Sequence, residues 1–244
     1  MGEPGQYRAL VRAFGVLRLA AAALALAAGP AAADCRLALA LGIDVSRSVS
    51  RLDYEVQRQG LMAALTAPEI RAAFLQPGGF VALALYEWSG RRHQELVVPW
   101  VAVQSEADLD AVVAKVAGRE RYDLHLPTGL GEALSYGREL FGTVGFCASY
   151  TLDISGDGQN NDGRHPARVY EAEDFSGILV NGLPIGGHEA DITDYYRKNV
   201  IRGPGAFVEP APSQEDFPRA IRRKLERELT RQLLGNLGRT GGRG

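Results

Sequence analysis

The fold is decided by the stretch Leu41-Gly42-Ile43-Asp44-Val45-Ser46-Arg47-Ser48-Val49-Ser50. It completes an apolar run, Leu37 to Ile43, whose length and continuous hydrophobicity predict a buried parallel strand. Asp44 ends this run, and Ser46 and Ser48 follow at alternate positions before a helical pattern begins. Ligands of open α/β sheets bind beyond the carboxyl ends of the strands, so these side chains form a candidate site of hard oxygen ligands. Such ligands favour Mg²⁺, Mn²⁺ or Ca²⁺ over zinc, although Asp and Ser are also ordinary capping and turn residues.

The composition fits one globular domain with a full core. The chain has 244 residues, a formal net charge of −2 and 46% hydrophobic residues. No strong basic patch is present, so we expect no nucleic-acid partner. The C-terminal segment is the most basic part, but its arginines alternate with glutamates and apolar residues, which is typical of the solvated face of a helix.

The N-terminal segment is predicted to be a signal peptide over residues 1–33. An apolar segment, Leu19 to Ala28, is followed by small residues that predict cleavage after Ala33. Positive charge precedes it at Arg8, Arg12 and Arg18. The apolar segment is too short for a good membrane span, and the alternative is an uncleaved anchor or an Ala-rich helix. We therefore expect a periplasmic or secreted protein with no stable membrane span after cleavage.

The chain has two cysteines, Cys35 and Cys147, and each lies just ahead of a predicted strand. If those strands are parallel neighbours, both cysteines lie at the same end of the sheet, and a disulfide is plausible in an oxidising compartment. It would stabilise the chain by up to about 4–5 kcal/mol in the chain-entropy model. The alternative is two buried free thiols. A zinc site is not expected from two distant cysteines and few histidines.

Strands alternate with helices after the signal segment, which predicts a parallel sheet covered by helices on both faces. The fold class expected is α/β: a doubly wound, mostly parallel, Rossmann-type three-layer sheet with one antiparallel edge strand. The domain is expected over 34–234, before a disordered tail at 235–244. The strands are predicted at 37–43, 80–88, 94–100 (the antiparallel edge), 150–155, 177–183 and 206–208, and the helices at 50–66, 68–74, 105–117, 128–141, 166–173, 192–200 and 213–234.

Three polar segments are expected to leave the same edge of this sheet. Asp44, Ser46 and Ser48 follow the first strand, Thr128 follows a polar loop, and Asp157 follows a later strand. The pattern resembles the von Willebrand factor A domain and its metal-ion-dependent adhesion site (MIDAS). In that resemblance Asp44-x-Ser46-x-Ser48 corresponds to the D-x-S-x-S loop, Thr128 to the lone threonine, and Asp157 to the final aspartate.

Within that fold the chain resembles an exported bacterial family of unknown function, the DUF1194 proteins. This resemblance implies a fold but no activity. The stretches that carry it are Val81–Gly90, Ile154–Asn161, Val180–Ile185, and Tyr195-Tyr196 followed by Gly203–Val208.

The resemblance to the A domain implies a specific chemistry for this site. The serines and the threonine would coordinate Mg²⁺ or Mn²⁺, with Mg²⁺ expected first and Ca²⁺ also possible, while the aspartates often act through water. One coordination position would stay open for an Asp or Glu side chain of a partner protein. Mg²⁺ prefers octahedral oxygen ligands and keeps several waters, which agrees with so few acidic groups. The alternative is a vestigial site that binds no metal.

Two other functions stay open. Gly156 to Asp162 is similar to a loop of haloacid dehalogenase-type phosphatases, in which Asp44 would be a nucleophile that forms an aspartyl-phosphate. Against this, Ser46 stands where most such enzymes have a second acid, and Lys115 is predicted in mid-helix. The chain also lacks a G-x-S-x-G elbow and a G-x-G-x-x-G loop after the first strand, so we do not expect an enzyme. The third possibility is a structural or interaction domain that uses no metal.

A few further residues near the expected edge have two interpretations each. His125 precedes Thr128 and is either a site residue or an exposed loop histidine. Glu87 and Trp88 end the second strand, where they either shape a recognition surface or pack locally. Tyr195 and Tyr196 have the same two interpretations.

Overall fold

The protein was analysed as a computed structural model, which describes residues 34–121, 126–189 and 191–240, with the backbone alone for 231–240. The predicted signal peptide and His125 lie outside the described residues. Within them, a five-stranded sheet has the order β3-β2-β1-β4-β5. β1 pairs in parallel with β2 and β4, β5 pairs in parallel with β4, and β3 is the antiparallel edge strand beside β2. The predicted fold class is confirmed. The strands are β1 (Cys35–Asp44), β2 (Phe80–Trp88), β3 (Gln94–Val103), β4 (Tyr150–Gly156) and β5 (Ile178–Pro184).

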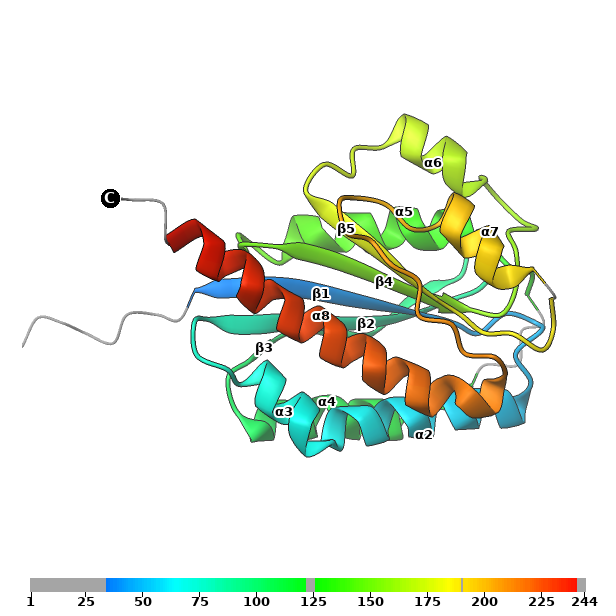
Figure 1. Cartoon of the computed structure of the whole chain (residues 1–244). Coiled ribbons are helices and arrows are strands. Elements are labelled where there is room, and N and C mark those ends of the chain that lie inside the picture. The colour runs from blue at the N-terminus through cyan, green and yellow to red at the C-terminus, as the bar shows by residue number, and fades with distance from the viewer. Residues whose placement is uncertain (1–33, 122–125, 190, 241–244) are drawn as a thin grey trace, which may run out of the picture. The chain divides into compact units, whose positions relative to one another are not determined.

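Helices cover both faces of the sheet (Figure 1). One face carries α2, α3, α4 and α8, and the other carries α5, α6 and α7. Each side encloses its own hydrophobic core, which is the arrangement expected of a doubly wound sheet. The helices are α2 (Arg51–Thr66), α3 (Pro68–Phe74), α4 (Glu106–Ala117), α5 (Leu130–Leu140), α6 (Pro166–Ala172), α7 (Ile192–Asn199) and α8 (Phe217–Thr240), with short 3₁₀ turns at Phe141–Thr143 and Gln214–Asp216.

β1 is the central strand and is buried along its whole length. Its leucines face the core under α2 and α8, while its alternating alanines face the core under α5, as the period of two in a strand requires. Gly42 leaves space for the Tyr86 ring, because a Cβ at Gly42 would lie 2.6 Å from Cζ of that ring. The Tyr86 hydroxyl donates a hydrogen bond of 2.7 Å to the Ala133 carbonyl on α5. Packing around Gly42 therefore holds the end of β1, and with it Asp44, against β2 and α5.

The opposite end of β1 is closed by a disulfide between Cys35 and Cys147. The two Cα atoms lie 4.6 Å apart, and the Ala148 N–H donates a hydrogen bond of 2.9 Å to the Cys35 carbonyl. The pairing considered from the sequence is thus present. It joins the beginning of β1 to the segment that leads into β4, at the edge of the sheet away from Asp44.

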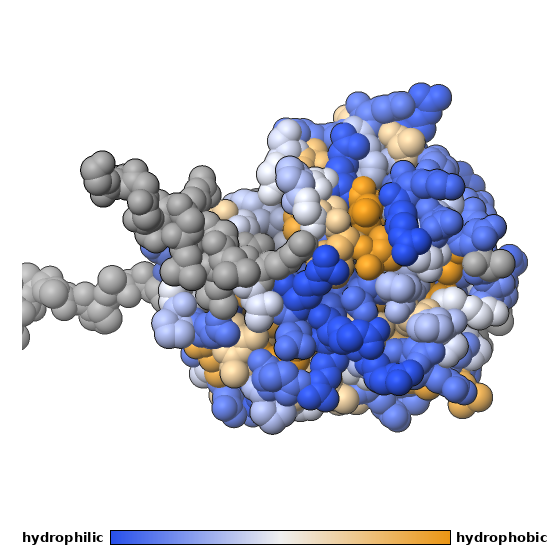
Figure 2. Space-filling view, viewed as in Figure 1, coloured by the Kyte–Doolittle hydropathy of each residue, from blue (hydrophilic) through white to orange (hydrophobic). Residues whose placement is uncertain are grey.

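α8 is an amphipathic helix that covers α2, α3 and the sheet. Its apolar side chains, among them Ile221, Leu225 and Leu229, are buried, and the face it shows to solvent is hydrophilic (Figure 2). The helix runs to Thr240, beyond the predicted end near Leu234. Part of the predicted tail thus continues α8, and residues 241–244 lie outside the described residues.

A buried ionic cluster lies beneath α8. Lys224 is fully buried, and its Nζ lies 2.8 Å from Asp153 Oδ1 on β4 and 2.7 Å from Glu228 Oε1. Asn181 on β5 donates a hydrogen bond of 2.8 Å from Nδ2 to the same Glu228 oxygen. Burial alone would lower the pKa of Lys224, but Asp153 and Glu228 outweigh it and raise the pKa above its usual value. The cluster thus supplies its own countercharge.

The short strand predicted at 206–208 is wrong. A single isolated bridge joins Val208 to Gly182 in its place. The Asn181 side chain accepts the Phe207 N–H at 3.0 Å, so this donor is not free to extend a ladder. Pro204 and Pro210 flank the segment, and proline supplies no N–H for strand pairing.

No helix among the residues that the structure describes is both long enough and apolar enough to cross a membrane.

Candidate metal site

Three segments distant in sequence meet beyond the carboxyl ends of β1 and β4. Ser46 Oγ lies 3.2 Å from Ser48 Oγ and 3.3 Å from Thr128 Oγ1. Ser48 Oγ in turn donates a hydrogen bond of 2.5 Å to Asp157 Oδ1. Asp44 Oδ1 accepts the Ser46 N–H at 2.7 Å, so this carboxylate lies directly behind the hydroxyls. The structure thus brings all five side chains predicted from the sequence into one cluster.

Asp44 is fully buried, and only one of its oxygens has a partner. Oδ2 has no hydrogen bond among the described residues. Burial and the nearby Asp157 raise the pKa of Asp44 to about 8, against hydrogen bonds from Ser46 that lower it. No cationic side chain contributes to this balance. A buried carboxylate without a countercharge is costly, so this position favours a cation supplied from outside the chain.

Asp157 is better satisfied than Asp44. Oδ1 accepts from Ser48, and Oδ2 accepts a hydrogen bond of 3.2 Å from Gln214 Nε2, which comes from the turn before α8. Burial raises the pKa of Asp157, while Ser48, the charge of His188 and Gln214 partly oppose the rise. Asp157 is therefore held in a fixed orientation with one oxygen at the hydroxyl cluster.

Thr128 is positioned by Asn161, which is not among the site residues predicted from the sequence. Asn161 Oδ1 accepts the Thr128 N–H at 2.9 Å, and the Asn161 N–H donates to the Thr128 carbonyl at 2.9 Å. The neighbouring Asn160 Oδ1 accepts the Gly131 N–H at 3.0 Å, at the beginning of α5. The two asparagines thus attach the loop after β4 to the segment that carries Thr128. The signal available in the sequence was the pair of consecutive asparagines directly after Gly156-Asp157-Gly158.

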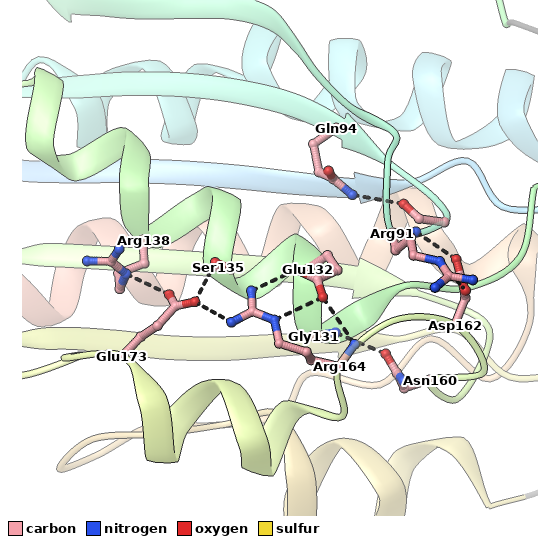
Figure 3. Close-up of polar contacts among 11 residues, drawn as sticks. Arg91, Gln94, Gly131, Glu132, Ser135, Arg138, Asn160, Asp162, Arg164 and Glu173 are labelled. Carbon is pink, nitrogen blue, oxygen red and sulfur yellow. Dashed lines mark hydrogen bonds and ion pairs between the residues drawn. The ribbon is translucent and has the colours of Figure 1, made fainter.

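The same loop is held at its far end by ion pairs (Figure 3). Asp162 accepts the Arg91 N–H at 2.8 Å and pairs with the Arg91 guanidinium, from the β2–β3 turn. Arg164 pairs with Glu132 on α5 and with Glu173 after α6, at 2.7 and 2.8 Å. These contacts tie the loop to three elements, which restricts motion of Asp157 relative to Thr128.

A cavity of about 140 Å³ opens beside the hydroxyl cluster. It gives solvent and small groups access to two of the hydroxyl side chains. Its lining residues are Arg47, Ser48, Pro127, Thr128, Gly158, Asn161, His188 and Glu189.

The chemistry of the cluster is that of hydroxyl and carboxylate oxygens. Among residues 34–121, 126–189 and 191–240, no group of three or more His, Cys, Asp and Glu side chains is placed to hold a metal ion. A cation at this edge would therefore depend on Ser46, Ser48 and Thr128 together with Asp44 and Asp157. Oxygen ligands with few charges suit a hard divalent cation that keeps part of its water shell.

The other residues singled out near this edge have structural roles. Glu87 is buried and accepts a hydrogen bond of 2.7 Å from the Tyr54 hydroxyl, and Trp88 is fully buried. Tyr196 is buried beneath the site, and Tyr195 donates its hydroxyl towards His165 or accepts from it at 3.3 Å. Local packing, rather than a recognition surface, accounts for Glu87 and Trp88.

Comparison with known proteins agrees with this architecture. The family model described as "Protein of unknown function (DUF1194)" matches residues 34–233. No curated protein sequence matches the chain significantly.

Several solved structures share the fold at low sequence identity. Proximal thread matrix protein 1 from the mussel byssus, whose structure has a zinc occupied MIDAS motif, is 14% identical with a TM-score of 0.60, over 80% of this chain and 46% of that chain. A von Willebrand factor type A protein from Catenulispora acidiphila is 15% identical with a TM-score of 0.53, over 81% and 43%. BatB from Bacteroides thetaiotaomicron is 13% identical with a TM-score of 0.52, over 80% and 99%. This chain thus spans less than half of the first two chains, and the likeness shows a von Willebrand factor A-like fold.

Proposed function

We propose that this chain, which belongs to the DUF1194 family and has a von Willebrand factor A-like fold, is an exported protein-binding module that engages an acidic side chain of a partner through a divalent cation. The observation that carries the proposal is Asp44. It is a fully buried carboxylate with one oxygen that has no hydrogen-bond partner among the described residues, and no cationic side chain is among the groups that shift its pKa.

The residues present fit a hard divalent cation. The Ser46 hydroxyl lies 3.2 Å from that of Ser48 and 3.3 Å from that of Thr128, so the three supply neutral oxygens, and the two aspartates supply the negative charge. Mg²⁺ is the cation expected first, and Mn²⁺ or Ca²⁺ would use the same ligands. When bound, the cation supplies a Lewis-acidic centre that attracts a carboxylate oxygen.

The chain's own residues have distinct roles in this proposal. Ser48 and Thr128 line the cavity and Ser46 lies behind them, and these neutral oxygens would hold the ion while leaving its attraction for an outside carboxylate largely intact. Asp44 balances the charge from the buried side, and Asp157 orients Ser48. Asn161 holds the peptide of Thr128 in place from both sides.

Export is part of the proposal and is supported by the disulfide between Cys35 and Cys147, since such bonds persist mainly in oxidising compartments. A binding role is favoured over a hydrolytic one because Lys115, the lysine weighed for a phosphatase, lies exposed on α4 and does not line the cavity. The partner is expected to offer Asp or Glu.

The test is calorimetric titration of the mature chain with Mg²⁺ and Mn²⁺, in parallel with Asp44→Ala and Asp157→Ala. We expect saturable one-to-one binding that is lost in both variants. Asp174→Asn, an exposed substitution after α6, serves as the control and should bind like the wild type. A folded wild type that binds neither ion would contradict a preformed metal site and favour a metal-free interaction surface.

A further inference from the structure

Glu189 is an acidic residue of the β5–α7 loop that lies at the candidate metal site. Its Oε2 accepts a hydrogen bond of 3.2 Å from the Gln159 N–H, in the loop that carries Asp157. Its Oε1 lies 3.8 Å from the position that a Cβ on Gly158 would take, and that same position is 3.1 Å from Thr128 Oγ1. Glu189 lines the cavity of about 140 Å³ together with Ser48 and Thr128.

The charge of this carboxylate is not neutralised by a salt bridge to any described residue, and its hydrogen bond comes from a backbone amide. The acidic group is thus directed into the cavity where a cation would be reached from outside.

The loop that carries Glu189 has the means to move. Gly187 precedes it with a φ of +100° and no atom within 4 Å of the position of a Cβ, whereas Gly186 is held by a hydrogen bond of 2.8 Å from its N–H to the Ala211 carbonyl. Glycine adopts such backbone angles without strain, so rotation at Gly187 can carry the carboxylate towards the cluster or away from it.

We propose that Glu189 is the chain's own carboxylate ligand for the cation. Without a partner it occupies the coordination position that a partner's Asp or Glu would take, and a partner binds by displacing it. This inference rests on the proposed function and adds its regulation. A partner must then compete with a tethered carboxylate. Only the fraction of sites that Glu189 leaves open is available to an incoming acidic group, so the apparent affinity of weak or non-specific acidic groups is lowered by that fraction.

The experiment uses Mn²⁺ as the probe and measures water-proton relaxation, which reports how many waters the bound ion retains. Wild type, Glu189→Ala, Glu189→Gln and the control Glu139→Ala are loaded with Mn²⁺ and titrated with acetate. Glu139 is exposed near the end of α5 that lies away from the site. We expect Glu189→Ala and Glu189→Gln to gain about one exchangeable water on Mn²⁺ and to bind acetate more tightly than the wild type and the control. If Glu189 occupies the position about nine tenths of the time, the gain in acetate affinity is about tenfold.

Each result decides between distinct conclusions. If the wild type binds Mn²⁺, and both Glu189 variants retain its number of waters and its acetate affinity, Glu189 is not a ligand, although the proposed metal site stands. If neither the wild type nor any variant binds Mn²⁺, the proposed function fails, and the role of Glu189 fails with it.

Discussion

Two buried carboxylates of the same sheet differ in the charged groups that surround them. Asp153, within β4, is paired with the buried ammonium of Lys224 at 2.8 Å beneath α8. Asp44, at the end of β1, is as fully buried, but no cationic side chain is among the groups that shift its pKa. Burial raises the pKa of both groups, to about 7 for Asp153, where Lys224 opposes the rise, and to about 8 for Asp44.

The difference separates a structural charge from one available for function. A buried ion pair is tolerated when both charges and their hydrogen bonds are satisfied inside the protein. Lys224 places one positive charge between Asp153 and Glu228 and links α8 to β4. No cationic side chain is among the groups that shift the pKa of Asp44, and this residue lies at the edge of the sheet where a cavity opens beside the neighbouring hydroxyls. This contrast motivates the proposal of a cation bound from solvent at this edge.

The largest expected effect comes from removing Lys224 from the buried ionic cluster. Lys224→Met leaves Asp153 and Glu228 buried without a cation, and we expect it to lower the free energy of unfolding by about 3–5 kcal/mol at pH 8. The raised pKa of Asp153 means that the folded chain holds more protons than the unfolded chain, so the variant's stability falls further as pH rises through that pKa, and the deficit is smaller at pH 5. Urea unfolding at pH 8 and at pH 5 measures the free energy of unfolding of the variant and of the wild type. Lys198→Met, at an exposed position of α7, is the matched control and should change stability by less than about 0.5 kcal/mol. A similar loss in both variants would show that the cluster contributes nothing specific.

The second prediction concerns the carboxylate without a countercharge. In the absence of metal, Asp44→Asn should leave the free energy of unfolding unchanged or higher, because it removes a buried acid whose ionisation is unfavourable while an oxygen remains to accept the Ser46 N–H. Mg²⁺ at one hundred times its Kd should stabilise the wild type by about 2.7 kcal/mol and Asp44→Asn not at all. Thermal unfolding with and without Mg²⁺ measures both effects, with Asp174→Asn as the control that keeps the full response. Equal stabilisation of Asp44→Asn and wild type would place the cation elsewhere.

A third prediction tests the hydrogen bonds between Asn161 and Thr128. Asn161→Ala removes the acceptor for the Thr128 N–H, and we expect the affinity for Mn²⁺ to fall by about 10- to 100-fold, as is usual when a group that orients a ligand is lost. Calorimetric titration measures the loss. Asn199→Ala, on α7, is the control for an asparagine outside the site and should keep the wild-type affinity. An unchanged affinity in Asn161→Ala would mean that Thr128 is held in place without this contact or is not a ligand.

The smallest effect is expected at Tyr196. Its hydroxyl is fully buried and has no hydrogen-bond partner among the described residues, while the ring packs in the core beneath the site. Tyr196→Phe should therefore change the free energy of unfolding by less than about 1 kcal/mol or raise it. Urea unfolding checks this, and Tyr86→Phe gives the contrast, because that hydroxyl has a partner, the Ala133 carbonyl, and its loss should destabilise the protein. A marked loss of stability in Tyr196→Phe would indicate a bridging water between this hydroxyl and Asp44.

Local features of the fold were predictable from the sequence, because their signals span only a few residues. Ser50 with Asp53 and Ser105 with Asp108, each pair three residues apart, form capping boxes that begin α2 and α4. The apolar run that became β1 is continuous because the strand is buried on both faces. The strand predicted at 206–208 failed because Asn181, distant in sequence, takes the Phe207 N–H.

For the candidate site, the sequence alone established which oxygen-bearing side chains follow the strands, since strand ends and turn residues are local features. Only the tertiary structure decided which charges are balanced. Asn161 is paired with Thr128 across 33 positions, and Lys224 meets Asp153 through the docking of α8. Such pairs depend on the packing of helices against the sheet, and no periodicity or spacing in the chain encodes them. The absence of a cation beside Asp44 among the described residues is likewise a property of that packing, and it is what turns a strand-end aspartate into a candidate metal site.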